Sequence, residues 1–114
     1  MIHEYRGDCS VPALVDGICD ELVGSLDRTY QFHELELSVS RPLDETWRIA
    51  AYRPGMAVPF MALMVDRKTS GWRRPWRVYE ADEYGNWGHL EPLSEHRYVY
   101  RAVAEVLGRL ERER

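Results

Sequence analysis

The chain has 114 residues, of which 45% are hydrophobic and 30% are charged, and its formal net charge is −4. This length suits one domain with a single core, residues 1–114, and the ordinary composition excludes a largely disordered chain. No apolar run approaches the ~20 residues of a membrane span, and the first residues lack the pattern of a signal peptide. We therefore expect a cytoplasmic protein with no membrane partner.

Charge is distributed in four blocks along the chain. Residues 1–45 carry −7, residues 46–78 carry +6, residues 79–96 carry −5 and residues 97–114 carry +2. Segregation of this kind predicts a molecule that has surfaces of opposite sign and meets a charged partner.

The first predicted element is an amphipathic helix of about 17 residues that begins after Ser10 and ends near Asp27. Ser10 supplies a hydroxyl N-cap, and proline is tolerated in the first turn. Apolar residues recur at spacings of three and four: Val11, Leu14, Val15, Ile18, Leu22 and Leu26. The polar side carries Ala13, Gly17 and Gly24, which predict either close approach of a second copy in a homodimer or exposed glycines without a role.

The hydrophobic period then changes from that of a helix to that of a strand. Residues 30–40 alternate apolar with acidic side chains, which predicts one half-buried strand. Residues 46–53 predict a second strand, and Pro54-Gly55 after it is a turn signal.

Three further strands are predicted beyond this turn. Residues 57–65 are apolar on both faces and predict a covered strand, with a buried helix as the alternative. Pro59 indicates that this strand lies near an edge or a bulge. Residues 76–81 predict a fourth strand and residues 87–90 a short fifth one.

The last predicted element is a C-terminal helix with Ser94 as its N-cap. One stripe of it is apolar, made of Val99, Ala102, Val103, Val106, Leu107 and Leu110, with Tyr98 and Tyr100 beside it. Short connections favour antiparallel neighbours. We therefore predict an α+β two-layer sandwich: a four- to five-stranded meander-like antiparallel sheet with the N- and C-terminal helices packed on one face.

The segment 71–77 is the sharpest candidate for a binding site. Its candidate residues are Trp72, Arg73, Arg74, Trp76 and Arg77. Arginine and tryptophan are enriched in protein interfaces, and the same combination binds single-stranded nucleic acid. An acidic chain lacks the overall basic character of a nucleic-acid-binding protein, and a hairpin arm with solvated arginines is the alternative without a function.

Acidic side chains form a second candidate. The first helix contributes Asp16, Asp20, Glu21 and Asp27 and the first strand contributes Glu34 and Glu36, and together they predict one acidic face suited to a basic partner. An ordinary solvated surface explains the same residues without a partner.

The sequence contains no constellation of residues that predicts catalysis, a metal or another cofactor. Cys9 and Cys19 are predicted to be free thiols, because a helix between them separates them too widely for a disulfide. Neither the cysteines nor the histidines match a nucleophile or metal-ligand motif. Trp47, Tyr52 and Trp87 are the residues that would line a small-ligand cavity between the sheet and the helices.

These observations favour a small non-catalytic module that binds another protein, as an inhibitor, an immunity protein or an adaptor. Charge would steer its encounter with the partner, and arginine or tryptophan side chains would anchor the complex that occludes it. A nucleic-acid-associated protein using residues 71–77 and a small-ligand-binding domain are the alternatives.

Overall fold

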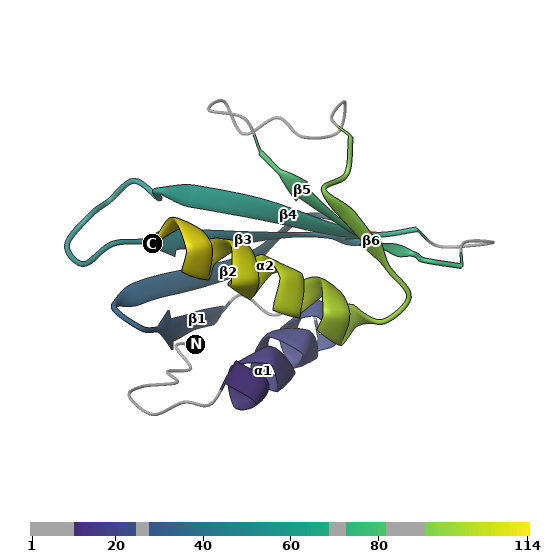
Figure 1. Cartoon of the computed structure of the whole chain (residues 1–114), viewed down its shortest axis with the longest axis horizontal. Coiled ribbons are helices and arrows are strands. Elements are labelled where there is room, and N and C mark those ends of the chain that lie inside the picture. The colour runs from purple at the N-terminus through teal and green to yellow at the C-terminus, as the bar shows by residue number, and fades with distance from the viewer. Residues whose placement is uncertain (1–10, 25–27, 69–72, 82–90) are drawn as a thin grey trace.

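The computed structural model describes residues 11–24, 28–68, 73–81 and 91–114. Within these residues two helices and six strands are found: α1 (Val11–Gly24), β1 (Arg28–Phe32), β2 (Leu35–Leu43), β3 (Thr46–Tyr52), β4 (Met61–Arg67), β5 (Trp76–Glu80), β6 (Ser94–His96) and α2 (Val99–Glu113). The strands form one antiparallel sheet in the order β1-β2-β3-β4-β5-β6, and both helices lie on the same side of it (Figure 1). The predicted α+β meander is confirmed.

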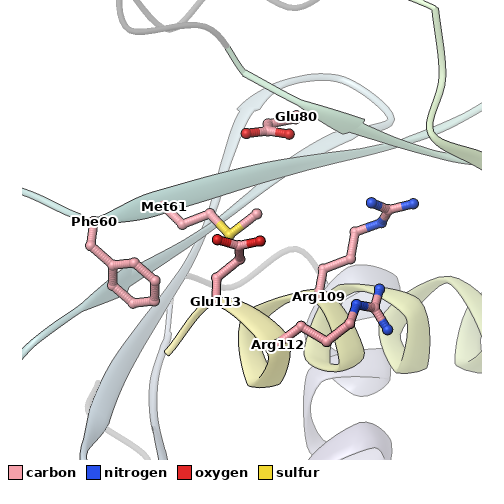
Figure 2. A pocket seen from close by; sticks show the side chains of 6 residues that line it. All are labelled: Phe60, Met61, Glu80, Arg109, Arg112 and Glu113. Atoms are coloured by element: carbon pink, nitrogen blue, oxygen red, sulfur yellow. The ribbon is translucent and has the colours of Figure 1, made fainter.

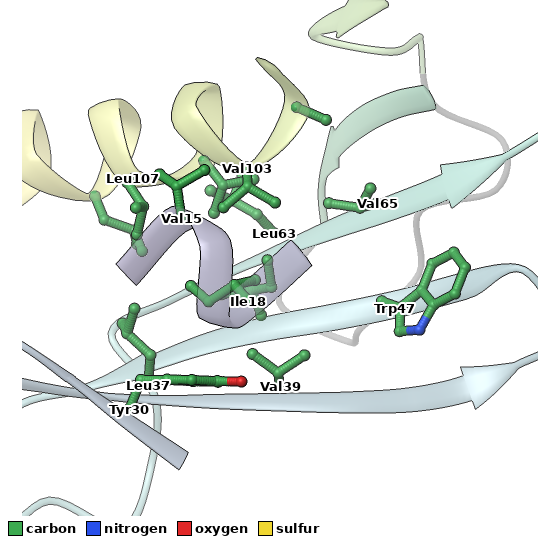
Figure 3. Close-up of a cluster of buried hydrophobic side chains, with 14 of the residues drawn as sticks. Val15, Ile18, Tyr30, Leu37, Val39, Trp47, Leu63, Val65, Val103 and Leu107 are labelled. Atoms are coloured by element: carbon green, nitrogen blue, oxygen red, sulfur yellow. The ribbon is translucent and has the colours of Figure 1, made fainter. Parts of the chain in front are cut away.

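The core lies between the helices and one face of the sheet (Figure 3). Strand residues that are paired across the ladder share a face, so Val39, Ile49 and Leu63 point together toward the helices. The predicted helix stripes supply the other half of this core, with Leu14, Val15, Ile18 and Leu22 from α1 and Ala102, Val103, Val106, Leu107 and Leu110 from α2. The periodicity therefore identified the core-facing stripe of each helix, apart from Val11, whose side chain the structure does not describe, and Leu26, which lies outside the described residues.

The predicted strand over residues 30–40 is wrong in one respect, because it is a hairpin of two strands. β1 ends at Phe32 and β2 begins at Leu35, with Phe32 paired to Leu35 across the turn. His33 takes a positive φ of 55° in this turn. Neither His33 nor Glu34 is a glycine or an asparagine, the residues that normally announce such a turn, so the alternation hides it.

The segment around Ser94 also differs from the prediction. Ser94 lies in β6 and does not cap a helix, and α2 begins at Val99 with Tyr98 as its N-cap residue. The short β6 pairs with β5 at the edge of the sheet. The predicted strand at residues 87–90 and the predicted N-cap Ser10 lie outside the described residues.

The apolar run 57–65 contributes a strand only from Met61 onward. β4 pairs with β3 on one side and β5 on the other, so it is an interior strand. Pro59 lies before the strand, where its missing N–H removes nothing from the ladder. Residues 53–60 form the connection from β3 to β4, in which residues 53–58 are exposed and Pro59 and Phe60 are half-buried.

Candidate partner-binding surface

Two tyrosines and two arginines form a stack at the N-terminal end of α2. The Tyr98 and Tyr100 rings lie 5.7 Å apart, centroid to centroid, with 17° between their planes. The Arg97 guanidinium lies 5.4 Å from the Tyr98 centroid, and that of Arg101 lies 5.4 Å from the Tyr100 centroid. Tyr98 is 51% exposed and Tyr100 46%, so the stack faces solvent.

The backbone at the start of α2 produces this arrangement. Tyr98 has extended dihedral angles, φ −119° and ψ 141°, and the helix begins at the next residue. Val99 is half-buried and packs against the core. Its neighbours Tyr98 and Tyr100 are thereby left at the surface beside each other.

Two more arginines come from the connection between β4 and β5. The pairing of Trp76 with His96 brings the residues that precede β5 alongside those that follow β6. Arg73 and Arg74 lie in this connection and are exposed. We define the basic surface as Arg73, Arg74, Arg97, Tyr98, Tyr100 and Arg101.

The electrostatic surroundings of His96 show that the β4–β5 connection and the start of α2 are close in space. Burial lowers the pKa of His96, and the positive charges of Arg101 and Arg74 lower it further, against the opposing effect of Glu105. His96 shares a 2.8 Å hydrogen bond with the hydroxyl of Ser94. Arginines from the β4–β5 connection and from α2 therefore act on the same imidazole.

No carboxylate among the described residues forms an ion pair with the four arginines of the basic surface. Arginines elsewhere are paired: Arg109 lies 2.7 Å from Glu105, and Arg114 lies 2.8 Å from Glu34. The basic surface thus concentrates positive charge that the described part of the fold does not neutralise.

The start of α2 lacks the features that usually stabilise a helix N-terminus. Tyr98 makes no capping hydrogen bond with its side chain, and the first turn contains no acidic residue. Arg101 instead brings positive charge close to the positive end of the helix dipole, which costs about 0.3–1 kcal/mol. An anion bound at this surface would be favoured by both the arginines and the helix dipole.

Only part of the predicted segment 71–77 belongs to the basic surface. Arg73 and Arg74 do, and Trp72 lies outside the described residues. Trp76 is only 6% exposed and packs against Trp47 in the core, with 5.6 Å between their centroids. Arg77 lies on the sheet face away from the helices, where it approaches Glu95 and Tyr79 at 3.4 and 3.3 Å.

The predicted acidic face is divided among separate surfaces. Glu21 was wrongly placed on it, because Glu21 is 2% exposed and pairs with Arg28 at 2.7 Å. Asp27 lies outside the described residues. Asp16 and Asp20 are exposed on α1. Glu34 lies in the β1–β2 turn and bonds to Arg114 at the end of α2. Glu36 is paired in register with Tyr52, on the sheet face away from the helices.

The glycine stripe of the first helix is not a free surface. Gly17 is buried, and its carbonyl accepts a 3.0 Å hydrogen bond from the Tyr30 hydroxyl. The expectation that Gly17 lies on the exposed polar side is therefore wrong, because β1 packs there. Ala13 is exposed, and the structure does not describe the surroundings of Gly24.

Cys19 is a half-buried free thiol on α1. Burial raises the pKa of Cys19 to about 11, with further contributions from Asp16 and Asp20, which disfavours a reactive thiolate. The described residues contain no group of three His, Cys, Asp or Glu side chains that could hold a metal ion. Cys9 and Trp87 lie outside the described residues. Trp47 and Tyr52 point to opposite faces of the sheet, so they do not line a common cavity.

In the sequence, Tyr98 and Tyr100 of the run Arg97-Tyr-Val-Tyr-Arg101 predict only the flank of an apolar stripe. Its symmetric order, with one core residue between two tyrosines and an arginine at each end, is the signal that could have identified the stack. No protein-family model, curated protein or solved structure matches this chain. In the part of the chain that the structure describes, no helix is both long enough and apolar enough to span a membrane.

Proposed function

We propose that this protein is a non-catalytic module that binds an acidic region of a partner protein through its basic surface. The observation that carries the proposal is the exposed stack of Arg97, Tyr98, Tyr100 and Arg101, flanked by Arg73 and Arg74 and without acidic partners among the described residues. Arginine and tyrosine are prominent among residues that dominate protein interfaces. Positive charge gathered at one end would steer the encounter with the partner.

The geometry of the stack favours carboxylates over nucleic-acid bases. Each tyrosine ring lies beside the other tyrosine ring and beside an arginine guanidinium, which leaves less of its surface open to a stacking base. Binding of single-stranded nucleic acid depends on open ring faces on which bases stack. The N–H groups of a guanidinium lie in its plane and bind carboxylates in a fork geometry, which stacking does not obstruct.

The modes of action that we propose are occlusion of the partner, as an inhibitor or immunity protein does, or its recruitment, as an adaptor does. Both modes of action require a rigid binding surface and no catalytic residues. The cytoplasm is the proposed compartment, because two cysteines predicted to be free suit reducing conditions.

The test is capture from an extract of the native host on the immobilised protein, with half of the extract treated with nuclease. Three proteins are compared: the wild type, Arg97→Gln/Arg101→Gln, and Arg109→Gln/Arg112→Gln as a control that makes the same change at the other end of α2. We expect a stoichiometric protein that survives nuclease treatment, is retained by the control and is lost with the first variant. Recovery that disappears with nuclease would support the nucleic-acid alternative instead, and equal recovery by both variants would exclude the basic surface.

A further inference from the structure

A second surface lies at the opposite end of the sheet, in the connection from β3 to β4 (Figure 1). Residues 54–60, which we call the apolar loop, are Pro-Gly-Met-Ala-Val-Pro-Phe and contain no polar side chain, in a chain that is 30% charged. Met56 is 59% exposed and Val58 71% exposed. Adjacent exposed apolar side chains on one projection are characteristic of interaction sites.

The apolar loop is held in one conformation by contacts at its base. The Met56 N–H donates to the Arg53 carbonyl at 3.1 Å, and the Phe60 N–H donates to the Ala51 carbonyl at 2.9 Å. The Arg53 guanidinium lies 4.6 Å from the centroid of Phe60, whose ring packs against the core. Gly55 supplies the positive φ of 74° that the turn requires. A loop ordered in this way loses little conformational entropy when it binds.

Charged hollows flank the loop on both sides. The hollow on one side, about 200 Å³, is lined by Phe60 and Met61 together with Glu80, Glu113, Arg109 and Arg112 (Figure 2). The hollow on the other side is lined by Pro54, Gly55 and Met56 together with the polar and charged side chains of Gln31, Glu34, Glu36, Tyr52 and Arg53. Among the described residues, Glu36, Glu80 and Glu113 have no ion pair.

We propose that the apolar loop inserts Met56 and Val58 into an apolar cleft of a folded protein that carries basic groups at its rim, opposite Glu36, Glu80 and Glu113. A lipid bilayer fits less well, because unpaired carboxylates beside the loop would be repelled by anionic headgroups. A second copy of this chain fits less well too, since the two hollows beside the loop contain charged side chains and offer no apolar cleft. This inference does not depend on the basic surface. The variant Arg109→Gln/Arg112→Gln removes positive charge from one hollow and leaves Glu80 and Glu113 in place, so it should not weaken binding of a basic rim here.

The first step of the test is photo-cross-linking with p-benzoylphenylalanine at three positions in native host cells. Position 58 reports on the apolar loop and position 100 on the basic surface. Position 43 is the control, because Leu43 is 63% exposed but lies at the opposite end of β3 from the loop. We expect position 58 to give a product that position 43 does not give, cross-linked at an apolar cleft of the partner.

The second step measures the affinity of that purified partner for Met56→Asp/Val58→Asp and for the control Leu43→Asp. We expect the loop variant to bind at least about 10-fold more weakly, the loss expected for central interface residues, and the control to bind as the wild type does. Equal urea-unfolding midpoints would show that both variants fold.

Several results would overturn the proposal. One is a product from position 100 with none from position 58, which would leave the basic surface intact as a binding site. Another is a product from position 58 that is only a second copy of the chain. A third is loop-dependent sedimentation with phosphatidylcholine vesicles in place of a protein partner. Products from position 58 alone would instead leave the apolar loop supported and count against the proposed function.

Discussion

Two ion pairs with the same separation illustrate what burial does to a charge. Arg28 Nε lies 2.7 Å from Glu21 Oε1, and Arg109 Nε lies 2.7 Å from Glu105 Oε1. The Glu21 side chain is 3% exposed, whereas that of Glu105 is 28% exposed. Removing the arginine would leave a buried carboxylate without its counter-charge only in the pair of Arg28 with Glu21.

We therefore predict unequal effects of two identical substitutions. Arg28→Met should lower the free energy of unfolding by about 3 kcal/mol, because Glu21 is left buried and uncompensated. Arg109→Met should lower it by no more than about 0.5 kcal/mol, the value of an exposed pair within a helix. Urea denaturation measures both. Similar losses for the two variants would contradict this account, and Glu21→Leu/Arg28→Met should recover most of the stability.

Asp66 is a buried acid on the sheet face away from the helices. It is 6% exposed, and its Oδ1 atom has no hydrogen-bond partner. Burial raises the pKa of Asp66, and the nearby positive charges of Lys68 and Arg77 oppose this only in part. A carboxyl whose pKa is higher in the folded than in the unfolded chain favours folding while it is protonated, and this contribution is lost as the pH rises through the raised value.

Asp66→Asn should accordingly become more stable than the wild type as the pH rises. The two proteins should have similar free energies of unfolding near pH 3, where the acid is neutral in both states. The difference should grow toward about pH 7. Denaturation at a series of pH values checks this prediction. Subtracting the free energy of unfolding of the wild type from that of the variant removes the effects of the remaining carboxyls. A variant that is the less stable protein at pH 7 would mean that the 3.6 Å contact with Lys68 dominates.

At the scale of an element, the first turn of α2 contains residues that reduce the stability of the helix. Arg101 lies at the third helical position, where a negative charge would be favourable, and Tyr98 does not cap the helix. Local choices that oppose the fold are characteristic of functional sites. The other end of α2 is conventional, with Arg112 in the last turn.

Reversing the charge at the two ends of α2 should have opposite effects on stability. Arg101→Glu should raise the free energy of unfolding by about 0.5 kcal/mol, because the gain with the dipole exceeds the loss of an exposed cation–π contact. Arg112→Glu should lower it by a similar amount. Thermal or urea unfolding measures both variants. A loss of stability with Arg101→Glu would indicate that the stack serves the fold.

The two helices, the β1–β2 hairpin and β6 show which parts of the fold could be predicted from the sequence. Both helices and their buried stripes followed from the spacing of apolar residues, which depends only on helix geometry. The hairpin at His33 did not, because its turn residues are atypical and the alternation of side chains continues across it. Ser94 met the composition rule for an N-cap, yet pairing with β5 took precedence over that local preference.

The candidate site was predictable only in part, for a reason of the same kind. Arg73 and Arg74 were identified from the density of charge in their own segment. Their association with Arg97 and Arg101 depends on the pairing of β5 with β6, a contact between segments about 20 residues apart. Trp76 could not be assigned to the core or to the surface until the face of β5 was known.

At the scale of the whole molecule, the two candidate surfaces lie at opposite ends of the sheet and differ in chemistry. The basic surface lies where β4 ends and β5 begins, and the apolar loop lies where β3 ends and β4 begins. Residues of oppositely charged blocks pair in the fold, as Arg114 does with Glu34 and Arg77 with Glu95, whereas the four arginines of the basic surface form no ion pair with a described carboxylate. With this arrangement, one candidate surface can be bound while the other stays accessible.

The most direct test of the basic surface is the affinity of the purified partner for the two double variants of α2 at about 50 and about 500 mM NaCl. We predict that Arg97→Gln/Arg101→Gln binds about 10- to 100-fold more weakly at low salt and that added salt removes most of this difference, because it screens the exposed charges. Arg109→Gln/Arg112→Gln should bind as the wild type does at both concentrations. Equal affinities of the two variants, or a difference that salt does not reduce, would contradict charge-directed binding through the basic surface.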